Sequence, residues 1–303
     1  MRAVRIYKYG GPETLKYEDD VPEPAIGAET VLIETIATSV NPIDWKVRSG
    51  ARQKDFPLDL PAILGRDVSG VVKGVGSEVR TFKPGDHVIA MANATYAELV
   101  AVPEALVSHL PDGVDPIDAA AIPLVVLTGD QLVRLATQAK AGQTILVSGA
   151  LGSVGRAAVH TAKKLGAKVI VGVRARQFAE AEALGGDAVL AIDDDVAIAK
   201  LEPVDGVADT VGGETGAKLL ARVRPGGRFG YASVLPDDAA KKASVEIKRV
   251  FAQPDPAKLR EFADDIRDRK FVLPVSQRLP LSETATAHAL LEKGGHGKIV
   301  LTL

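Results

Sequence analysis

The chain has 303 residues, a length typical of two packed domains, and its 46% hydrophobic and 25% charged residues exclude a disordered or fibrous class. A net charge of −2, with Lys and Arg scattered along the chain, argues against a nucleic-acid partner. The absence of cysteine excludes disulfides and Cys-ligated metal sites, and without a signal-like start or an apolar run of spanning length we expect a cytoplasmic protein with no membrane partner.

The first hundred residues indicate an irregular β-rich domain. Apolar segments at residues 30–40, 68–75 and 87–91 are separated by Gly and Pro, which is typical of short strands joined by turns. Residues 118–139 change to helical spacing. We therefore expect a domain boundary near residue 118.

From residue 142 onward the sequence indicates a doubly wound α/β domain. A strand at residues 144–148, a glycine-rich turn, a helix at residues 156–165 and a strand at residues 169–173 form a βαβ unit. The alternation then continues with strands near residues 188–192, 206–210 and 228–232 and helices near residues 177–184 and 215–223. Such alternation predicts a parallel sheet covered by helices.

The end of the chain is expected to return to the first domain. A helix at residues 257–269 is followed by β-like sequence and a closing apolar segment at residues 298–301. We predict a β-rich domain of residues 1–118 and 270–303, and a Rossmann domain of residues 119–269.

The glycine-rich turn is the strongest single motif. It reads Val147-Ser148-Gly149-Ala150-Leu151-Gly152-Ser153-Val154-Gly155, after an apolar strand and before an amphipathic helix. Glycines there permit a tight turn and bring backbone N–H groups close to a pyrophosphate at the helix N-terminus. The turn therefore predicts a dinucleotide site.

The end of the second strand of this βαβ unit favours NADPH over NADH. Enzymes that use NAD usually place a carboxylate there, on the ribose 2′-hydroxyl. Here no carboxylate occurs between Lys168 and Glu180, and the strand ends in Arg174-Ala175-Arg176. Two guanidinium groups suit a 2′-phosphate, although a solvated pair of surface arginines is the alternative.

Several ordered blocks resemble the zinc-free, zeta-crystallin-like quinone oxidoreductase branch of the medium-chain dehydrogenase/reductase superfamily. They span nearly the whole chain and comprise residues 10–13, 41–46, 64–72, 82–88, the glycine turn, residues 209–213 and residues 297–300. The resemblance implies an α/β protein with a GroES-like catalytic domain, completed by the C-terminal segment, an inserted Rossmann domain, and an active site between the two.

Zinc enzymes of that superfamily bind the metal through cysteine and through a histidine in a Gly-His-Glu block. Here the block reads Gly65-Arg66-Asp67, and the chain has no cysteine. The five histidines lack metal-ligand spacing. We therefore expect no metal site and disfavour zinc-assisted alcohol oxidation.

The resemblance also implies which residues form the site. Asn41, Asp44 and Lys46 match the branch's active-site block, where Lys46 would face substrate or coenzyme; a solvent-facing Lys46 beside a structural Asp44 is the alternative. The residues expected to bind the coenzyme are Asn41, Lys46, Thr128, Ser148, Gly149, Ala150, Leu151, Gly152, Ser153, Val154, Gly155, Arg174, Arg176, Val211, Gly212, Ala232, Ser233, Val234, Phe251 and Lys298. Loops near residues 92–94 and 236–243 often shape the substrate pocket in relatives.

Without a metal, the chemistry open to a nicotinamide is direct hydride addition to a quinone or an α,β-unsaturated carbonyl compound. Reduction of 2-enoyl thioesters and a non-catalytic NADPH-binding or sensor role are the alternatives. Relatives are commonly dimers, so we expect a homodimer.

Overall fold

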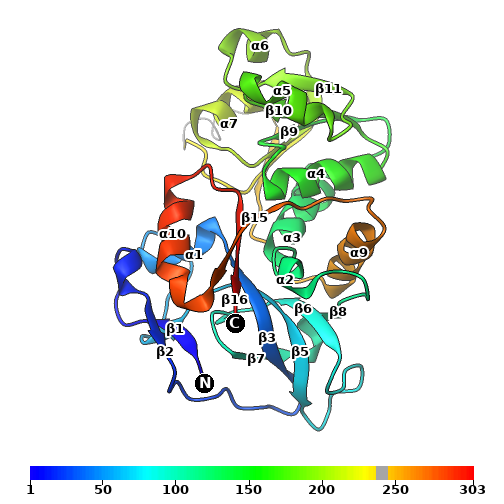
Figure 1. The fold of residues 1–303 in the computed structure, drawn as a ribbon. Coiled ribbons are helices and arrows are strands. Elements are labelled where there is room, and N and C mark those ends of the chain that lie inside the picture. The colour runs from blue at the N-terminus through cyan, green and yellow to red at the C-terminus, as the bar shows by residue number, and fades with distance from the viewer. Residues whose placement is uncertain (237–244) are drawn as a thin grey trace. The chain divides into compact units, whose positions relative to one another are not determined.

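The computed structural model describes residues 1–236 and 245–303 and divides into two compact units (Figure 1). The β-rich unit comprises residues 1–124 and 254–303, and the doubly wound unit comprises residues 125–253. Within the described ranges, no helix is both long enough and apolar enough to cross a membrane.

A seven-stranded sheet forms the centre of the β-rich unit. Its strands are β3 (Thr30–Val40), β5 (Asp67–Val75), β6 (His87–Met91), β7 (Leu99–Pro103), β8 (Val107–His109), β15 (Val275–Pro280) and β16 (Lys298–Thr302). β16 runs antiparallel to β3, with Leu301 opposite Thr38, so the end of the chain completes the sheet as expected. Alternating apolar side chains of β3 and β5, including Val31, Ile33 and Val68, face a buried core.

A three-stranded sheet and short helices surround this sheet. The small sheet consists of β1 (Ala3–Ile6), β2 (Lys16–Glu18) and β4 (Ala62–Ile63), and the helices are η1 (Pro12–Thr14), α1 (Pro42–Arg48), η2 (Glu104–Leu106), α2 (Pro116–Ala119), α9 (Pro256–Arg267), η5 (Leu281–Glu283) and α10 (Thr284–Lys293).

The doubly wound unit contains a six-stranded, fully parallel sheet in the order β11-β10-β9-β12-β13-β14. The strands are β9 (Thr144–Ser148), β10 (Lys168–Val173), β11 (Ala188–Ala191), β12 (Val204–Asp209), β13 (Val223–Tyr231) and β14 (Glu246–Arg249). The helices are α4 (Ser153–Lys164), η4 (Ala175–Gln177), α5 (Phe178–Glu182), α6 (Asp195–Lys200) and α7 (Gly213–Leu220). This is the Rossmann strand order: from β9 the chain adds strands first on one side (β10, β11) and then on the other (β12, β13, β14), so the order of the strands reverses between β9 and β12.

The helical segment expected at residues 118–139 forms three pieces. α2 is followed by α3 (Pro123–Gln131) and then by a π-helical segment, η3 (Leu132–Thr137). Gly129 lies within α3, and a Cβ there would lie 2.5 Å from the carbonyl oxygen of Val154. The absence of a side chain therefore lets α3 pack closely against α4.

The division into units differs from the expected limits at residues 118 and 270. It falls after Leu124 and after Gln253, so that α9 belongs to the β-rich unit. The physical reason is that α9 packs on β8 and β6, and the Arg267 side chain approaches Gly113. Of the two loops expected to shape a pocket, residues 92–94 are described, whereas most of residues 236–243 lies outside the described part.

Candidate functional site

The turn after β9 has the geometry of an anion-binding loop. Gly149 adopts φ +62°, and a Cβ at Gly155 would lie 2.2 Å from the carbonyl oxygen of Gly149. α4 then begins after exposed Gly152, and no side chain caps its first turn. Its first N–H groups therefore have no partner within the helix, as a bound pyrophosphate requires.

Hydrogen bonds tie the carboxyl ends of β9 and β12 together. Ser148 Oγ donates to Asp209 Oδ1 at 2.5 Å, and Thr210 Oγ1 donates to the Ser148 carbonyl oxygen at 2.7 Å. Gly212 N donates to Asp209 Oδ2 at 2.9 Å. Burial raises the pKa of Asp209, and its hydrogen bonds oppose that rise. These bonds hold Ser148 and Gly212 at the edge where the strand order reverses, which is where such sheets bind ligands.

Apolar side chains at this edge remain exposed. Val211, Val234 and Phe251 have exposed fractions of 42%, 59% and 43%, which are high for large apolar residues. Ala232 and Ser233, which directly precede Val234 in the chain, are half-buried. Thr128 precedes Gly129, whose close approach to Val154 places this part of α3 beside the first turn of α4.

The arginine turn after β10 is exposed. Both Arg174 and Arg176 are solvent-accessible, and no ion pair of either guanidinium occurs among residues 1–236 and 245–303. Gln177 Oε1 accepts from Arg174 N at 3.2 Å, and Asp193 Oδ1 accepts from Ala175 N at 2.8 Å. Sequence reasoning missed Asp193, because it follows a different strand, β11.

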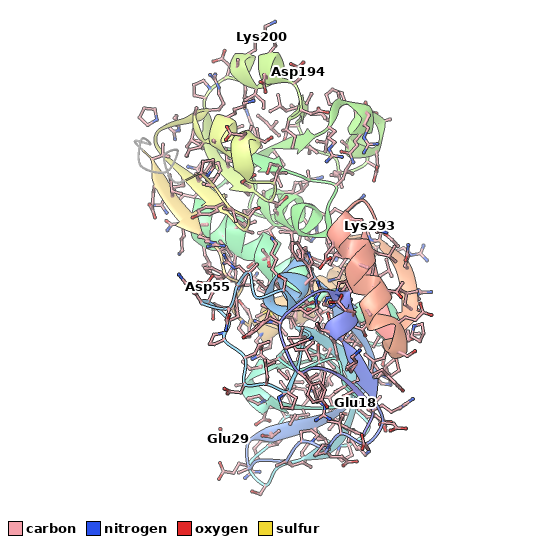
Figure 2. All side chains as sticks on the ribbon, turned by 90° about the vertical axis from the view of Figure 1, so that its left-hand side faces the viewer. Glu18, Glu29, Asp55, Asp194, Lys200 and Lys293 are labelled. Carbon is pink, nitrogen blue, oxygen red and sulfur yellow. The ribbon has the colours of Figure 1, made fainter. Side chains whose placement is uncertain are left out.

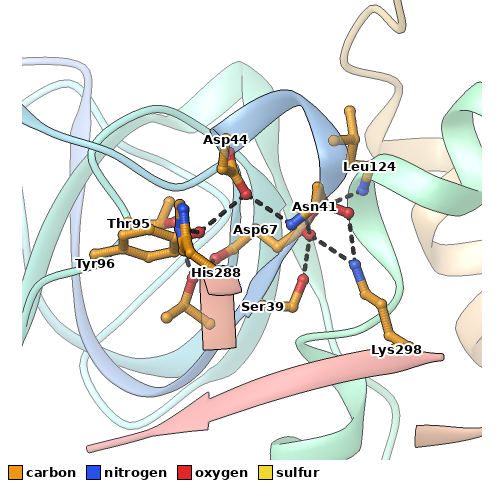
Figure 3. Close-up of polar contacts among 10 residues, drawn as sticks. Ser39, Asn41, Asp44, Asp67, Thr95, Tyr96, Leu124, His288 and Lys298 are labelled. Carbon is orange, nitrogen blue, oxygen red and sulfur yellow. Dashed lines mark hydrogen bonds and ion pairs between the residues drawn. The ribbon is translucent and has the colours of Figure 1, made fainter. Parts of the chain in front are cut away.

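In the β-rich unit, Asn41 lies at the centre of a buried polar network (Figure 3). Asn41 Nδ2 donates to Asp67 Oδ2 at 2.6 Å, and Lys298 Nζ donates to Asn41 Oδ1 at 2.6 Å. Asp67 also accepts from Ser39 Oγ and, at 2.7 Å, from Leu124 N. The structure thus brings together Asn41 and Lys298, and it adds Asp67, to which sequence reasoning gave no role.

Asp44 connects Asn41 to a second part of this network. Its Oδ2 accepts from Asn41 N at 2.8 Å, which caps the start of α1, and from Tyr96 OH at 2.9 Å. Tyr96 OH lies 3.1 Å from His288 Nε2, and His288 Nδ1 lies 3.2 Å from Arg48 Nη1. Sequence reasoning missed Tyr96 and His288, since residues so distant in sequence leave no local signal.

Burial governs the ionisation of these groups. It raises the pKa of Asp44 to about 7 and the pKa of Tyr96 well above its usual value. It lowers the pKa of His288 to about 3, and the positive charge of Arg48 acts in the same direction. Burial also lowers the pKa of Lys298, although Asp67 and Asp44 oppose that change. His288 is therefore neutral at physiological pH.

Lys46 and Trp45 lie on α1, and both are half-buried. The Lys46 ammonium lies 5.6 Å from the centroid of the Trp45 ring. The ammonium is therefore within the range of a cation–π contact with that ring. α1 thus carries one residue held inside the network, Asp44, and one that lies near the surface, Lys46.

Arg66 occupies the position of the histidine ligand in zinc enzymes. Its Nη1 donates to Asn93 Oδ1 at 2.8 Å, and its guanidinium lies 5.8 Å from the centroid of the Phe56 ring. Neighbouring Asp67 is fully engaged by hydrogen-bond donors. The part of the chain that the structure describes contains no group of three or more His, Cys, Asp or Glu residues able to hold a metal ion.

The chain is similar to known dehydrogenases and quinone oxidoreductases. Residues 27–112 match an alcohol dehydrogenase GroES-like domain, and residues 165–301 match a zinc-binding dehydrogenase domain. The quinone oxidoreductase of Pseudomonas aeruginosa is 35% identical over 316 residues, which cover 96% of this chain and 95% of that protein. The human quinone oxidoreductase is 38% identical over 172 residues, 56% of this chain and 52% of that protein. The chloroplastic NADPH-dependent alkenal/one oxidoreductase of Arabidopsis thaliana is 37% identical over 207 residues, 64% of this chain and 52% of that protein.

Solved structures of the same fold cover the whole chain. The quinone oxidoreductase of Coxiella burnetii has a TM-score of 0.88 at 30% identity, covering 100% of this chain and 99% of that one. An NAD-dependent alcohol dehydrogenase has a TM-score of 0.86 at 30% identity, covering 100% of both chains. A mycobacterial protein complexed with NADPH has a TM-score of 0.84 at 28% identity, again covering 100% of both chains.

Proposed function

Because this chain belongs to the quinone oxidoreductase branch of the medium-chain dehydrogenase/reductase superfamily, we propose that it reduces quinones or α,β-unsaturated carbonyl compounds with NADPH and without zinc. The observation that carries the proposal is the turn from Gly149 to Gly155, with its close glycine packing and uncapped α4. It lies where the parallel sheet reverses its strand order, the usual position of a dinucleotide in this fold.

Each candidate residue of the doubly wound unit has a proposed task toward the coenzyme. A reduced nicotinamide supplies the hydride. The first N–H groups of α4 hold the pyrophosphate, and exposed Val211, Val234 and Phe251 offer apolar surface to the rings. Thr128, on α3, and Ala232 and Ser233, which precede Val234 in the chain, are further proposed contacts of the coenzyme.

The choice of NADPH rests on Arg174 and Arg176. Both side chains are exposed at the end of β10, and neither forms an ion pair within the described residues. Guanidinium groups bind a phosphate through paired, charge-assisted hydrogen bonds, whereas a 2′-hydroxyl offers them no charge. The similarity to a mycobacterial protein complexed with NADPH supports the choice of NADPH. Because the chain is also similar to an NAD-dependent alcohol dehydrogenase, both coenzymes should be tested.

For the chemical step we propose Lys46 as the group that stabilises negative charge on the substrate carbonyl oxygen. Asn41 and Asp44 would act by fixing the start of α1, since Asn41 binds Asp67 and Lys298 while Asp44 caps the helix. A direct coenzyme contact by Lys298 stays a prediction, because its ammonium is buried on Asn41 and Asp67.

The test is the loss of NADPH absorbance when 9,10-phenanthrenequinone, 1,4-benzoquinone or an alkyl vinyl ketone is added. We expect oxidation of NADPH by at least one of these acceptors. Lys46→Ala is expected to lower kcat about tenfold or more while the Kd for NADPH changes little, since charge on the oxygen develops only during hydride transfer. NADPH binding without oxidation by any acceptor would instead support the non-catalytic alternative.

Two further parts of the proposal need their own measurements. We propose a homodimer, which light scattering would show as about twice the 31.7 kDa mass of the chain. We also propose a cytoplasmic location, which fractionation of cells expressing the native sequence would check.

A further inference from the structure

Three consecutive carboxylates follow β11, and each has a different partner. Asp194 caps α6 by accepting from Val196 N at 2.8 Å, and Figure 2 labels it at the start of that helix, with Lys200 at the other end. Asp195 forms an ion pair with Lys218 at 2.7 Å. Asp193 alone contacts the turn that follows the neighbouring strand β10, where its Oδ1 accepts from Ala175 N at 2.8 Å. Asp194 and Asp195 stabilise α6, whereas Asp193 forms no bond to that helix.

The packing of β10 against β11 fixes Asp193 at the arginine turn. Val173 pairs with Ala191 in the parallel register, and Ile192 N donates to the Val173 carbonyl oxygen at 2.9 Å. A Cβ at Gly172 would lie 2.9 Å from Ile192 Cγ2, so the two chains run in close contact up to this point. One carboxylate therefore lies at the middle residue of a turn that carries two guanidinium groups.

We infer that Asp193 supplies the carboxylate that β10 lacks and sets how strongly the protein discriminates between the two coenzymes. Its Oδ2 forms no hydrogen bond within the described residues, so it can accept from a ribose 2′-hydroxyl as a carboxylate at the end of β10 does in NAD enzymes. The same charge repels a 2′-phosphate and engages the Ala175 N–H that the phosphate could use. Arg174 and Arg176 therefore favour NADPH only in part, and NADH remains a ligand.

This inference rests on the proposed function, because it assumes that the ribose of a nicotinamide coenzyme reaches the arginine turn. The decisive comparison uses fragments that carry no nicotinamide. We would measure the Kd of 2′,5′-ADP, 5′-AMP, NADPH and NADH by calorimetry for the wild type and for Asp193→Asn. The amide keeps an oxygen that can accept from Ala175 N while removing the charge.

Asp193→Asn is expected to tighten 2′,5′-ADP and NADPH by about three- to tenfold, the range of a single exposed charge, and to weaken 5′-AMP and NADH. Higher salt should shrink the gain for the phosphorylated ligands. Asp193→Glu, which keeps the charge, should preserve the wild-type ratio. Asp195→Asn removes the same charge two residues away and should change the ratio by less than about twofold.

An unchanged or lower preference of Asp193→Asn for 2′,5′-ADP over 5′-AMP would overturn the inference. If both nucleotides weakened together, the turn would depend on the carboxylate for its shape alone, and the inference would again be wrong. Failure of the proposed function is distinguishable, because the wild type would then either bind neither NADPH nor NADH, or bind NADPH without oxidising it when any of the acceptors is added.

Discussion

The two units build their candidate sites in opposite ways. In the doubly wound unit, the glycine turn and the arginine turn each occupy a few consecutive residues and leave their donors unpaired or exposed. In the β-rich unit, residues from seven separate elements or loops meet in a buried network whose donors and acceptors mostly satisfy one another. One arrangement is suited to receive a ligand, whereas the other is suited to hold α1 in place.

This difference predicts that a substitution inside the network lowers the free energy of unfolding. Asp67→Asn keeps the shape of the side chain but removes the charge that faces Lys298 and places an NH2 group among donors from Ser39, Asn41 and Leu124. We expect the free energy of unfolding to fall by about 3–5 kcal/mol, as when one partner of a buried ion pair is lost. Urea denaturation would measure it.

The control lies in the same sheet. Glu34 on β3 forms a 3.9 Å ion pair with Lys73, and the two side chains are 57% and 46% exposed. Glu34→Gln is therefore expected to change the free energy of unfolding by less than about 0.5 kcal/mol. Equal effects of Glu34→Gln and Asp67→Asn would contradict the view that the network is a structural element.

The network also predicts a pH dependence of stability that the exposed turns do not share. The pKa of His288 is lowered to about 3 in the folded protein, so between about pH 3 and 6.5 the unfolded chain binds the extra proton. Stability contributed by neutral His288 is therefore present above the unfolded pKa and is lost as pH falls through this window. Asp44, raised to about 7, has the opposite sign: stability falls as pH rises from about 4 to 7.

Since the two effects oppose each other, the histidine contribution is best measured as a difference. The free energy of unfolding of the wild type minus that of His288→Gln should increase with pH between about 3 and 6.5, by up to about 1.4 kcal/mol per pH unit, and then level off. His87→Gln, a change at an exposed histidine, serves as the control. A difference that is constant over this window would show that His288 is not held neutral by its surroundings.

The sequence predicted the features of the exposed turns better than those of the buried network. The strand at residues 144–148, the turn and the arginine pair were found because periodicity and glycine spacing are local signals. Tyr96, His288 and the bond between Asp193 and Ala175 were not found, since they depend on which strands and helices become neighbours. The unit to which α9 belongs was not found for the same reason, because its helical pattern does not show which sheet it packs on.

The exposed arginine turn is expected to affect the choice of coenzyme and to have almost no effect on stability. Replacing both Arg174 and Arg176 with alanine should lower the preference for NADPH over NADH by about tenfold or more, since it removes the two guanidinium groups that we propose bind the 2′-phosphate. It should leave the free energy of unfolding within about 0.5 kcal/mol of the wild type, because both side chains are exposed and neither forms an ion pair within the described residues. Ratios of kcat/KM for the two coenzymes, together with urea denaturation, would measure both quantities.

Lys200→Ala, at an exposed cation on α6, is the matched control. An unchanged coenzyme preference would remove the arginines from the proposed site, while a large loss of stability would mean that the turn, like the network, is a structural element.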